Sequence, residues 1–258
     1  MKFPKDKNKK GSPIVLPDTR KMWVTCFVSG AVLWLIGLAL WKQVRIDEST
    51  LFFFNASRIA YTPLVVLSQW FTSYGMAVIT GIFVVYLLIS QKLKYFDAPL
   101  TYYLYTICSF GLSGIAGDLL KEVFSRPRPA ATYVSQILAL SQSATPAIPS
   151  GHATKSIALI LPFILLVPNS KNLHKVIKIV ITLIASGVCL SRIVLGAHYL
   201  SDFIAGIGMA LICFPFSMMF ANMILRKINQ EKLPILSKVW GVLLIFLIIV
   251  FMIVVSDF

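Results

Sequence analysis

Charge and cysteine are scarce in this sequence. Asp, Glu, Lys and Arg together make up 13% of the 258 residues, about half of the roughly 25% found in ordinary soluble domains. The four cysteines form no CxxC pair and lie inside apolar stretches, which excludes a disulfide-stapled module. The chain has no long-period repeat, and its composition also excludes an intrinsically disordered or collagen-like protein.

Apolar residues and positive charge are in excess. Ala, Val, Ile, Leu, Met, Phe, Trp, Tyr and Cys account for 57% of the chain, and the mean hydropathy is +0.81. There are 24 Lys and Arg residues against 10 Asp and Glu, a net charge of +14. A basic chain often binds nucleic acid, but here most basic residues lie between long apolar stretches. We therefore expect a membrane protein and no nucleic-acid partner.

Seven apolar stretches are long enough, or nearly so, to cross a bilayer, which takes about 20 helical residues. They cover 22–41, 64–90, 99–120, 153–168, 176–190, 203–225 and 239–255. The stretches that start at 153 and 176 are short, so we expect their helices to extend into the polar motifs beside them. The first 21 residues hold seven basic residues and no apolar core, so no cleavable signal peptide is expected.

The predicted fold is an all-α integral membrane protein. Residues 1–21 form a basic cytoplasmic tail, 22–225 a core of six transmembrane helices, and 226–258 a cytoplasmic loop followed by a seventh C-terminal transmembrane helix. Within the core, the partly apolar segment 43–62 carries four charged residues. We expect it to form an interfacial helix on the outer side, with a plain connector as the alternative.

The distribution of basic residues orients the chain. With the N-terminus in the cytoplasm, the cytoplasmic segments are 1–21, 91–98, 169–178 and 226–238. They hold 16 of the 24 basic residues, as the positive-inside rule predicts. The other eight fall on the outer side or in the outer ends of the spans, and these need another reason to be there.

Three polar clusters fall on that outer side. The first contains three cations within eight residues: Lys121, Arg126 and Arg128. Lysine is a mobile point charge, while the planar fork of arginine can grip two oxygens of a phosphate. The prolines that follow both arginines keep the chain extended. The cluster suits an anion site, and snorkelling at the interface is the alternative.

The second cluster is Pro149-Ser150-Gly151-His152, directly before the fourth apolar stretch. Ser150 is a plausible helix N-cap, and free N–H groups at a helix start bind anions. Gly151 lets a ligand approach the backbone, which leaves His152 beside that ligand. The alternative is an ordinary cap with an interfacial histidine. A serine-hydrolase G-x-S-x-G elbow is disfavoured because Ile148 occupies the first glycine position.

The third cluster runs from Ser191-Arg192 to His198 and Asp202. Histidine and aspartate four residues apart share one face if they are helical. A carboxylate bonded to one imidazole nitrogen fixes the tautomer and leaves the other nitrogen as a nucleophile or base. A satisfied His–Asp pair at a helix start is the alternative.

Together the clusters place two histidines, an aspartate, a lysine and two or three arginines on one membrane face. This set of side chains suits the binding and transfer of a phosphoryl group. A metal site fits poorly, because the third histidine, His174, lies in a predicted cytoplasmic loop and the outer carboxylates show no paired-metal spacing.

These motifs resemble those of the type-2 phosphatidic acid phosphatase superfamily, whose core is similar to vanadium haloperoxidases and bacterial acid phosphatases. The family signature is K-x6-R-P, then P-S-G-H, then S-R-x5-H-x3-D. Lys121 to Pro129, Pro149 to His152 and Ser191 to Asp202 match it at every position. The resemblance covers roughly residues 20–225 and implies a six-helix transmembrane phosphatase core.

The resemblance also implies a role for each motif residue. His198 attacks the phosphorus and forms a phosphohistidine, Asp202 orients it, and His152 protonates the leaving group and later activates water. The phosphoryl oxygens are held by the remaining motif residues: Lys121, Arg128, Arg192, Ser150 and Gly151. No metal and no organic cofactor are implied. Outside the motifs, Arg126 could contact a second phosphate or the membrane surface, Asp118 could neutralise Lys121, and Lys155 could touch a headgroup.

The expected function is hydrolysis of a phosphate or diphosphate ester of a lipid held in the bilayer, at the outer face of a bacterial cytoplasmic (inner) membrane. Undecaprenyl diphosphate, phosphatidylglycerol phosphate and phosphatidic acid are the favoured substrate class. A lipid A 1-phosphatase and a lipid phosphotransferase are enzymatic alternatives, and a phospholipid transporter without turnover is an alternative of another class. The sequence leaves the oligomeric state open.

Overall fold

The computed structural model describes residues 20–55, 63–92, 99–140, 143–167, 169, 171–227 and the single positions 235, 239 and 243. Within these residues the chain forms eight α-helices and no strand. They are α1 (Arg20–Lys42), α2 (Val44–Phe54), α3 (Pro63–Lys92), α4 (Pro99–Phe124), α5 (Pro129–Thr132), α6 (Gly151–Leu166), α7 (Asn172–Val194) and α8 (Leu200–Lys227). Most of the predicted seventh span and most of the basic tail lie outside the described residues.

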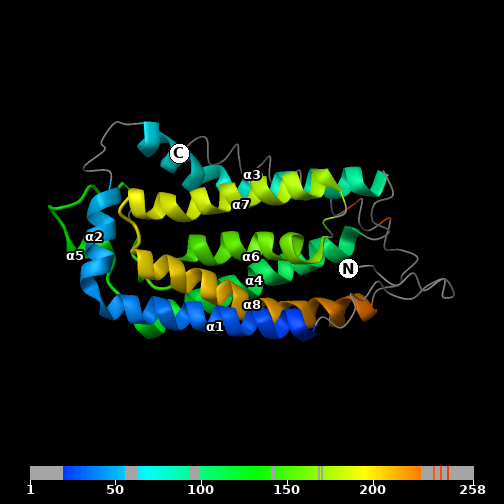
Figure 1. The fold of residues 1–258 in the computed structure, drawn as a ribbon, viewed down its shortest axis with the longest axis horizontal. Helices are drawn as coiled ribbons and strands as arrows, with labels where there is room; N and C mark the ends of the chain where they lie inside the picture. Colours follow the sequence, from blue (N-terminus) through cyan, green and yellow to red (C-terminus); the bar gives the residue numbers. More distant parts are fainter. Residues whose placement is uncertain are drawn as a thin grey trace.

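The six long helices run alongside one another as a bundle, and α2 lies with the short α5 across one end of it (Figure 1). Five of the six, namely α1, α3, α4, α7 and α8, are long and apolar enough to cross a membrane, and α6 is apolar but shorter. Each helix corresponds to one of the first six predicted apolar stretches. The prediction of an all-helical membrane protein is confirmed.

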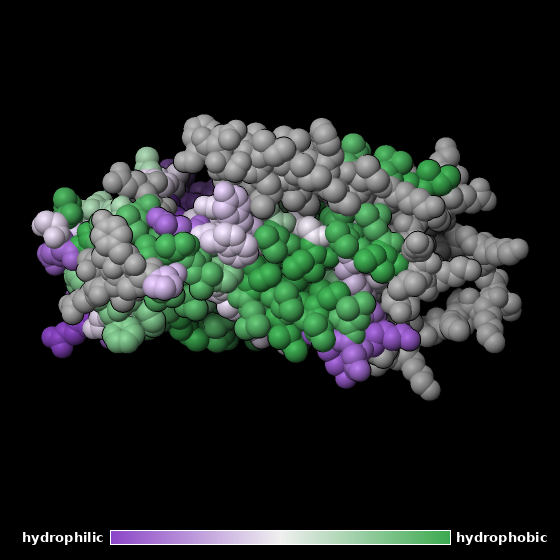
Figure 2. Space-filling view, turned by 90° about the horizontal axis from the view of Figure 1, so that it is seen from above, coloured by the Kyte–Doolittle hydropathy of each residue, from purple (hydrophilic) through white to green (hydrophobic). Residues whose placement is uncertain are grey.

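The outer surface of the bundle is apolar around its middle. Large apolar side chains such as Val24, Val28 and Leu35 of α1 are exposed. Figure 2 shows hydrophobic side chains over the middle of one face and hydrophilic ones toward both ends. Such a surface is unfavourable in water but matches the hydrocarbon core of a bilayer, where helices satisfy their own backbone hydrogen bonds. The chain is therefore a multi-pass membrane protein.

The central helix of the bundle is α6. It packs against α3, α4, α7 and α8, and most of its side chains are buried. It spans only 16 residues, because its first residue already lies beside the polar motif at one end of the bundle. Its neighbour α7 extends past the predicted apolar stretch and includes Ser191 and Arg192, as the sequence led us to expect.

Glycines bring α1 and α8 into close contact. A Cβ atom at Gly208 would lie 2.6 Å from the backbone nitrogen of Trp34 and 2.7 Å from the carbonyl oxygen of Gly30. A Cβ at Gly37 would lie 2.8 Å from the backbone nitrogen of Ala205. Small residues at a helix crossing let two backbones approach closely, which is how membrane helices gain packing energy. This contact fixes the start of α8, where Asp202 lies.

Candidate active site

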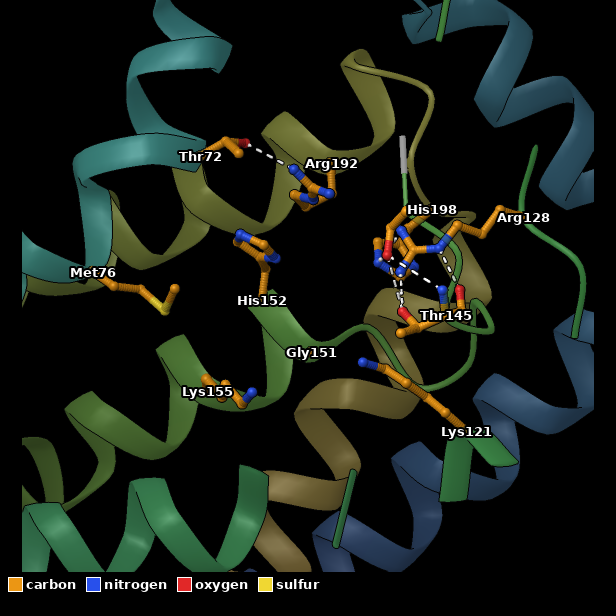
Figure 3. A pocket seen from close by; sticks show the side chains of 11 residues that line it. Thr72, Met76, Lys121, Arg128, Thr145, Gly151, His152, Lys155, Arg192 and His198 are labelled. Atoms are coloured by element: carbon orange, nitrogen blue, oxygen red, sulfur yellow. Dashed lines mark hydrogen bonds between the residues drawn. The ribbon is translucent and has the colours of Figure 1, made fainter. Parts of the chain in front are cut away.

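All three polar clusters meet at one end of the bundle. They come from the end of α4, the start of α6, the end of α7 and the start of α8, because successive helices run in opposite directions. A cavity of about 430 Å³ opens between them (Figure 3). It is lined by Thr72, Met76, Lys121, Arg128, Ser143, Thr145, Gly151, His152, Lys155, Arg192 and His198.

The first cluster delivers Arg128 from an extended segment. Helix α4 ends at Phe124, and Ser125 follows with a positive φ of 45°, a conformation common just after helix ends. The Arg128 guanidinium donates to the carbonyl oxygen of Thr145 (2.7 Å), to the Thr145 hydroxyl (2.9 Å) and to the carbonyl oxygen of Ala197 (3.3 Å). Neutral groups therefore aim the fork into the cavity, and no carboxylate of the described residues is ion-paired with Arg128.

Two lysines share one carboxylate at the edge of the cavity. The Lys121 ammonium lies 2.9 Å from one oxygen of Asp118, and the Lys155 ammonium lies 3.4 Å from the other. The side chain of Asp118 is 54% exposed, while that of Lys121 is only 10% exposed. The predicted neutralisation of Lys121 by Asp118 is present, and Lys155 joins the same group.

Helix α6 points its N-terminus at the cavity. The Ser150 hydroxyl accepts a hydrogen bond from the backbone N–H of Ala153 (3.5 Å), which confirms the predicted N-cap. The Ser150 N–H itself donates to the carbonyl oxygen of Asp202 (3.0 Å). A Cβ at Gly151 would lie 3.1 Å from the Lys121 nitrogen, so the absent side chain leaves room for Lys121. Figure 3 shows His152 pointing into the cavity from the start of α6.

His198 and Asp202 are in contact, but not because they share a helix face. His198 lies just before α8, which starts at Leu200, so the condition that both residues are helical is not met. Asp202 is the third residue of α8, and its Oδ2 accepts from the backbone N–H of Tyr199 (2.9 Å) as in a capping box. The same oxygen lies 3.2 Å from Nδ1 of His198.

The surrounding donors assign the tautomer of His198. Nη1 of Arg128 lies 3.4 Å from Nε2 of His198, and a guanidinium can only donate. Nε2 is therefore the acceptor, and Nδ1 carries the proton that is donated to Asp202. Burial, with the nearby charges of Arg128 and Arg192, lowers the pKa of His198 to about 4, although Asp202 opposes the shift. The imidazole is neutral at pH 7, and Nε2 faces the cations of the cavity.

Arg192 completes the ring of cations. It lies in the last turn of α7, is 4% exposed, and donates to the hydroxyl of Thr72 on α3 (3.5 Å). Four cations and two histidines thus line one cavity at the bundle end, beside a helix N-terminus. This arrangement can bind an anion with several oxygens and can offer a nucleophilic nitrogen to its centre. The described residues include no group of three or more His, Cys, Asp or Glu side chains that could hold a metal ion.

Comparison with known proteins gives a family match for one segment of the chain. The model of the PAP2 superfamily matches residues 100–224. This segment belongs to the PAP2 superfamily. A solved structure, that of a transmembrane PAP2-type phosphatidylglycerolphosphate phosphatase from Bacillus subtilis, is similar to the chain with a TM-score of 0.52 and 19% sequence identity. The similarity covers 79% of this chain and 97% of that one. A search of curated proteins gives no significant match.

The family matches the one inferred from the motifs, and all eight predicted site residues fall within the PAP2 segment. The structure also adds residues that the motifs do not contain. Thr145 holds Arg128, and Thr72 and Met76 form the α3 wall of the cavity. Thr72 and Met76 lie outside the PAP2 match, in an apolar helix whose sequence gives no sign of a polar contact to Arg192.

One residue of the PAP2 segment lies elsewhere than the sequence suggested. Arg126 was expected at a second phosphate or at the membrane surface. The structure instead buries it, 6% exposed, against Asp47 and Asp202 and away from the cavity lining. The buried carboxylates attract it more strongly than an exposed site would, because ion pairing is stronger where water is excluded.

Proposed function

We propose that this protein is a membrane lipid phosphatase that hydrolyses a phosphate or diphosphate ester through a phosphohistidine intermediate. The observation that carries the proposal is the position of His198. Its Nδ1 donates to Asp202, and its Nε2 faces a cavity lined by Lys121, Arg128 and Arg192. Membership of the PAP2 superfamily supports the same activity.

The geometry suggests how the first half of the reaction proceeds. The substrate phosphate is held between the two arginine forks and the Lys121 ammonium, with the N–H groups at the start of α6 as further donors. Nε2 of His198 attacks the phosphorus, and the bond from phosphorus to the leaving oxygen breaks. The imidazolium form of His152, stabilised by the negative phosphate bound beside it, gives its proton to that oxygen and becomes neutral. The imidazole gains positive charge as the bond forms, and the Asp202 carboxylate stabilises it.

The second half restores the enzyme. A water molecule attacks the phosphorus of the phosphohistidine, and His152 takes a proton from that water. The bond from phosphorus to Nε2 breaks, and inorganic phosphate leaves. Both histidines then have their starting protons, so ester and water have become alcohol and phosphate. The chain's own side chains perform every step, and the cations serve by positioning and charge stabilisation.

The place of the cavity indicates the substrate class. It lies at the polar end of an apolar bundle, so a lipid anchored in the bilayer can present its headgroup there while its chains stay in the hydrocarbon. We favour polyprenyl diphosphates, phosphatidylglycerol phosphate and phosphatidic acid, with the 1-phosphate of lipid A as an alternative. The similar Bacillus subtilis protein is a phosphatidylglycerolphosphate phosphatase by its title. Lys155 lines the cavity together with Lys121, and its ammonium could bind the second phosphate of a diphosphate.

The loop charges give the orientation that we propose. By the positive-inside rule, the basic segments place one end of the bundle in the cytoplasm, and this is the end that lies far from the cavity. The cavity then opens at the outer face of a bacterial cytoplasmic membrane, and the segment around α2 lies at the outer interface. A tail, a six-helix core and a C-terminal seventh span remain the proposed division of the chain.

A substrate panel tests this function. The purified protein in detergent is given phosphatidic acid, phosphatidylglycerol phosphate, undecaprenyl diphosphate and lipid A, and released phosphate is measured. His198→Ala should abolish release. His174→Ala is the matched control, because His174 lies about 27 Å from Arg192 along α7 at about 1.5 Å per residue. A wild type that releases phosphate and a His198→Ala variant with full rate would contradict the mechanism.

Trapping separates the possible fates of the phosphoryl group. Acid-labile radiolabel should attach to wild type and to the His174 variant during turnover with a phosphate-labelled substrate, but not to His198→Ala. Label found in a new lipid rather than in free phosphate would identify a phosphotransferase. Binding of the lipids without any release would favour a transporter.

A further inference from the structure

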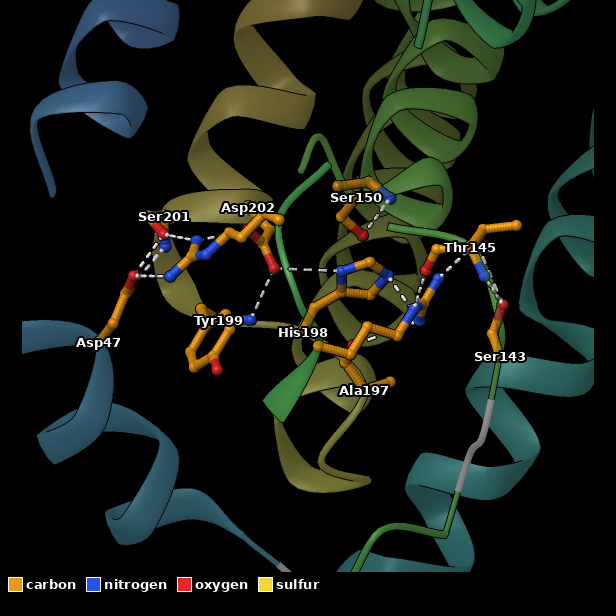
Figure 4. Close-up of polar contacts among 12 residues, drawn as sticks. Asp47, Ser143, Thr145, Ser150, Ala197, His198, Tyr199, Ser201 and Asp202 are labelled. Atoms are coloured by element: carbon orange, nitrogen blue, oxygen red, sulfur yellow. Dashed lines mark hydrogen bonds and ion pairs between the residues drawn. The ribbon is translucent and has the colours of Figure 1, made fainter. Parts of the chain in front are cut away.

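Helix α2 reaches the active site through a buried carboxylate. Oδ2 of Asp47 lies 2.7 Å from Nη2 of Arg126, and Nη1 of the same guanidinium lies 2.6 Å from Oδ1 of Asp202 (Figure 4). Asp202 in turn accepts from His198 at 3.2 Å. The three charged side chains of Asp47, Arg126 and Asp202 are 1%, 6% and 0% exposed. A continuous chain of charge-assisted hydrogen bonds thus joins α2 to the nucleophile.

The guanidinium of Arg126 is held in one position. It lies 4.0 Å from the ring centroid of Tyr199 and 5.4 Å from that of Trp41. Ser201 fills the space between the acids, because its hydroxyl accepts from Arg126 (2.6 Å) and donates to Asp47, while its N–H donates to Asp47 (2.9 Å). Every polar atom of the Asp47 carboxylate is therefore satisfied inside the protein.

The network determines which oxygen of Asp202 faces the histidine. Oδ1 is occupied by Arg126, so Oδ2 is left to accept from His198 and from the Tyr199 N–H. A buried aspartate held this way cannot rotate without breaking a charge-assisted bond. Asp47 has the complementary effect: it offsets the charge of Arg126, so that this cation does not neutralise the carboxylate that His198 needs.

We propose that Asp47 and Arg126 are positioning residues of the reaction, which orient Asp202 and set the negative charge that it presents to His198. The proposal rests on the proposed function, in which His198 is the nucleophile. It extends the active site beyond the PAP2 segment 100–224 to a helix that touches neither the cavity nor its substrate. Neither residue is a member of the three motifs.

A purely structural role makes different predictions. In that case Asp47 only docks α2 to the bundle, and its loss lowers stability and activity together. Glu48 offers the matched comparison, because it lies next in α2 and accepts from the Tyr133 hydroxyl. Glu48→Gln removes the negative charge and weakens the hydrogen bond from Tyr133, because a neutral amide oxygen accepts less strongly than a carboxylate, but it leaves the chain of Asp47, Arg126 and Asp202 intact.

The experiment measures kcat, KM and thermal unfolding in detergent for Asp47→Asn, Arg126→Lys, Arg126→Gln and Glu48→Gln, with His198→Ala as the inactive reference. We expect kcat to fall about 10–100-fold in each Asp47 and Arg126 variant, the usual effect of removing a partner that orients an active group, and KM to stay within about twofold. Lysine should not rescue Arg126, because an ammonium cannot bridge both carboxylates. Glu48→Gln should keep wild-type kcat.

The pH profile gives a readout that stability does not affect. Besides Asp202, the charged or titratable groups around His198 are Arg128, Arg192 and His152; those around Arg126 are the two aspartates, Tyr199 and Tyr133. Asp47→Asn leaves the Arg126 charge uncompensated, so protonation of His198 becomes harder and the acid limb of kcat/KM moves to lower pH. Arg126→Gln removes a cation, and the limb moves to higher pH.

The outcomes are distinct. If wild type releases phosphate from no lipid, the proposed function fails. If wild type is active and His198→Ala is inactive, but Asp47→Asn and Arg126→Gln keep wild-type kcat, the positioning role is refuted. The positioning role is also refuted if Glu48→Gln loses kcat in the same proportion to its loss of melting temperature as the Asp47 and Arg126 variants do. It is refuted as well if the acid limbs of Asp47→Asn and Arg126→Gln move in the same direction.

Discussion

The substitution Asp202→Asn tests the hydrogen bonding of the site, because the groups that contact the Asp202 carboxylate are donors. In the structure Oδ1 accepts from Arg126 (2.6 Å), while Oδ2 accepts from the Tyr199 N–H (2.9 Å) and from Nδ1 of His198 (3.2 Å). An asparagine amide has one acceptor and one donor group. The charged guanidinium takes the acceptor, so the NH2 group turns toward His198.

The cost follows from the bonds lost. Two hydrogen bonds to a buried carboxylate disappear, each contributing about 1.5–3 kcal/mol, and the NH2 group stabilises the tautomer whose proton is on Nε2. That proton blocks the nucleophilic nitrogen and faces Arg128, another donor. A loss of about 3–6 kcal/mol in the transition state corresponds to a fall in kcat of about 10²–10⁴-fold, similar to the effect of the same exchange in other His–Asp pairs.

The assay is phosphate release from the best substrate of the panel, with Asp202→Asn and the control Glu122→Gln purified in the same detergent. Glu122 lies beside Lys121 on α4, but its side chain is exposed and does not line the cavity. Because surface substitutions have small effects, Glu122→Gln should leave kcat within about threefold of wild type. A folded Asp202→Asn protein with more than a tenth of the wild-type kcat would refute the tautomer argument.

Three further predictions concern other parts of the molecule. Because burial lowers the pKa of His198 to about 4, the proposed nucleophile is neutral above that pH. The acid limb of kcat/KM, corrected for the substrate's own ionisation, should therefore lie near pH 4, and an acid limb near 6.5 would contradict this. Lys155→Ala should lower kcat/KM for a diphosphate lipid at least tenfold more than for a monophosphate, and equal losses would remove the second-phosphate role. Gly208→Ala should lower the melting temperature, because its Cβ would meet the α1 backbone at 2.6 Å and overpacking costs about 1–3 kcal/mol. Gly111→Ala, whose Cβ meets nothing within 4 Å, is the control that should not destabilise.

The spans could be predicted because bilayer thickness sets a length that a single sequence can match. Their ends could not all be placed from hydropathy. The continuation of α7 over Ser191 and Arg192 was expected from the shortness of its apolar stretch and not from hydropathy, and it is possible because these polar residues are buried inside the bundle, 2% and 4% exposed. Helix α2 covers Val44–Phe54, only part of the segment expected to be an interfacial helix. Its position relative to a membrane stays a prediction.

The motif residues could be predicted to meet because alternation of the spans brings them to one end. The contacts of the buried Asp47 could not be predicted in this way. Asp47 is a lone aspartate 154 residues from the Ser201 that it binds, and no local pattern announces such a contact. Its place between Lys121 and Arg128 in the sequence suggested that Arg126 could contact a second phosphate or the membrane surface, but Lys121 and Arg128 line the cavity and Arg126 does not. Only the tertiary structure shows that the arginines serve different groups.

The division between the two arginines follows from the chain between them. Both precede a proline, which restricts each to extended backbone, and Arg128 has φ −75° and ψ 159°. In an extended chain residues i and i+2 point to the same side, about 6–7 Å apart. Arg126 and Arg128 thus approach the His198–Asp202 pair from one segment and reach its opposite ends: Oδ1 of the acid and Nε2 of the imidazole.

This spacing explains why neighbouring arginines can have opposite effects on the nucleophile. In the proposed mechanism the cation at Nε2 lies where the phosphate would bind, and its charge would lower the energy of the transferred group. The cation at Oδ1 lies behind the carboxylate, where an uncompensated charge would weaken the support of His198. Within the described part of the chain, this second cation has a carboxylate partner on its far side, Asp47, whereas Arg128 is ion-paired with none. The proposed positioning role thus gives the buried Asp47 of α2 a reason tied to the position of Arg126, since without Asp47 both ends of the His198–Asp202 pair would face an uncompensated positive charge.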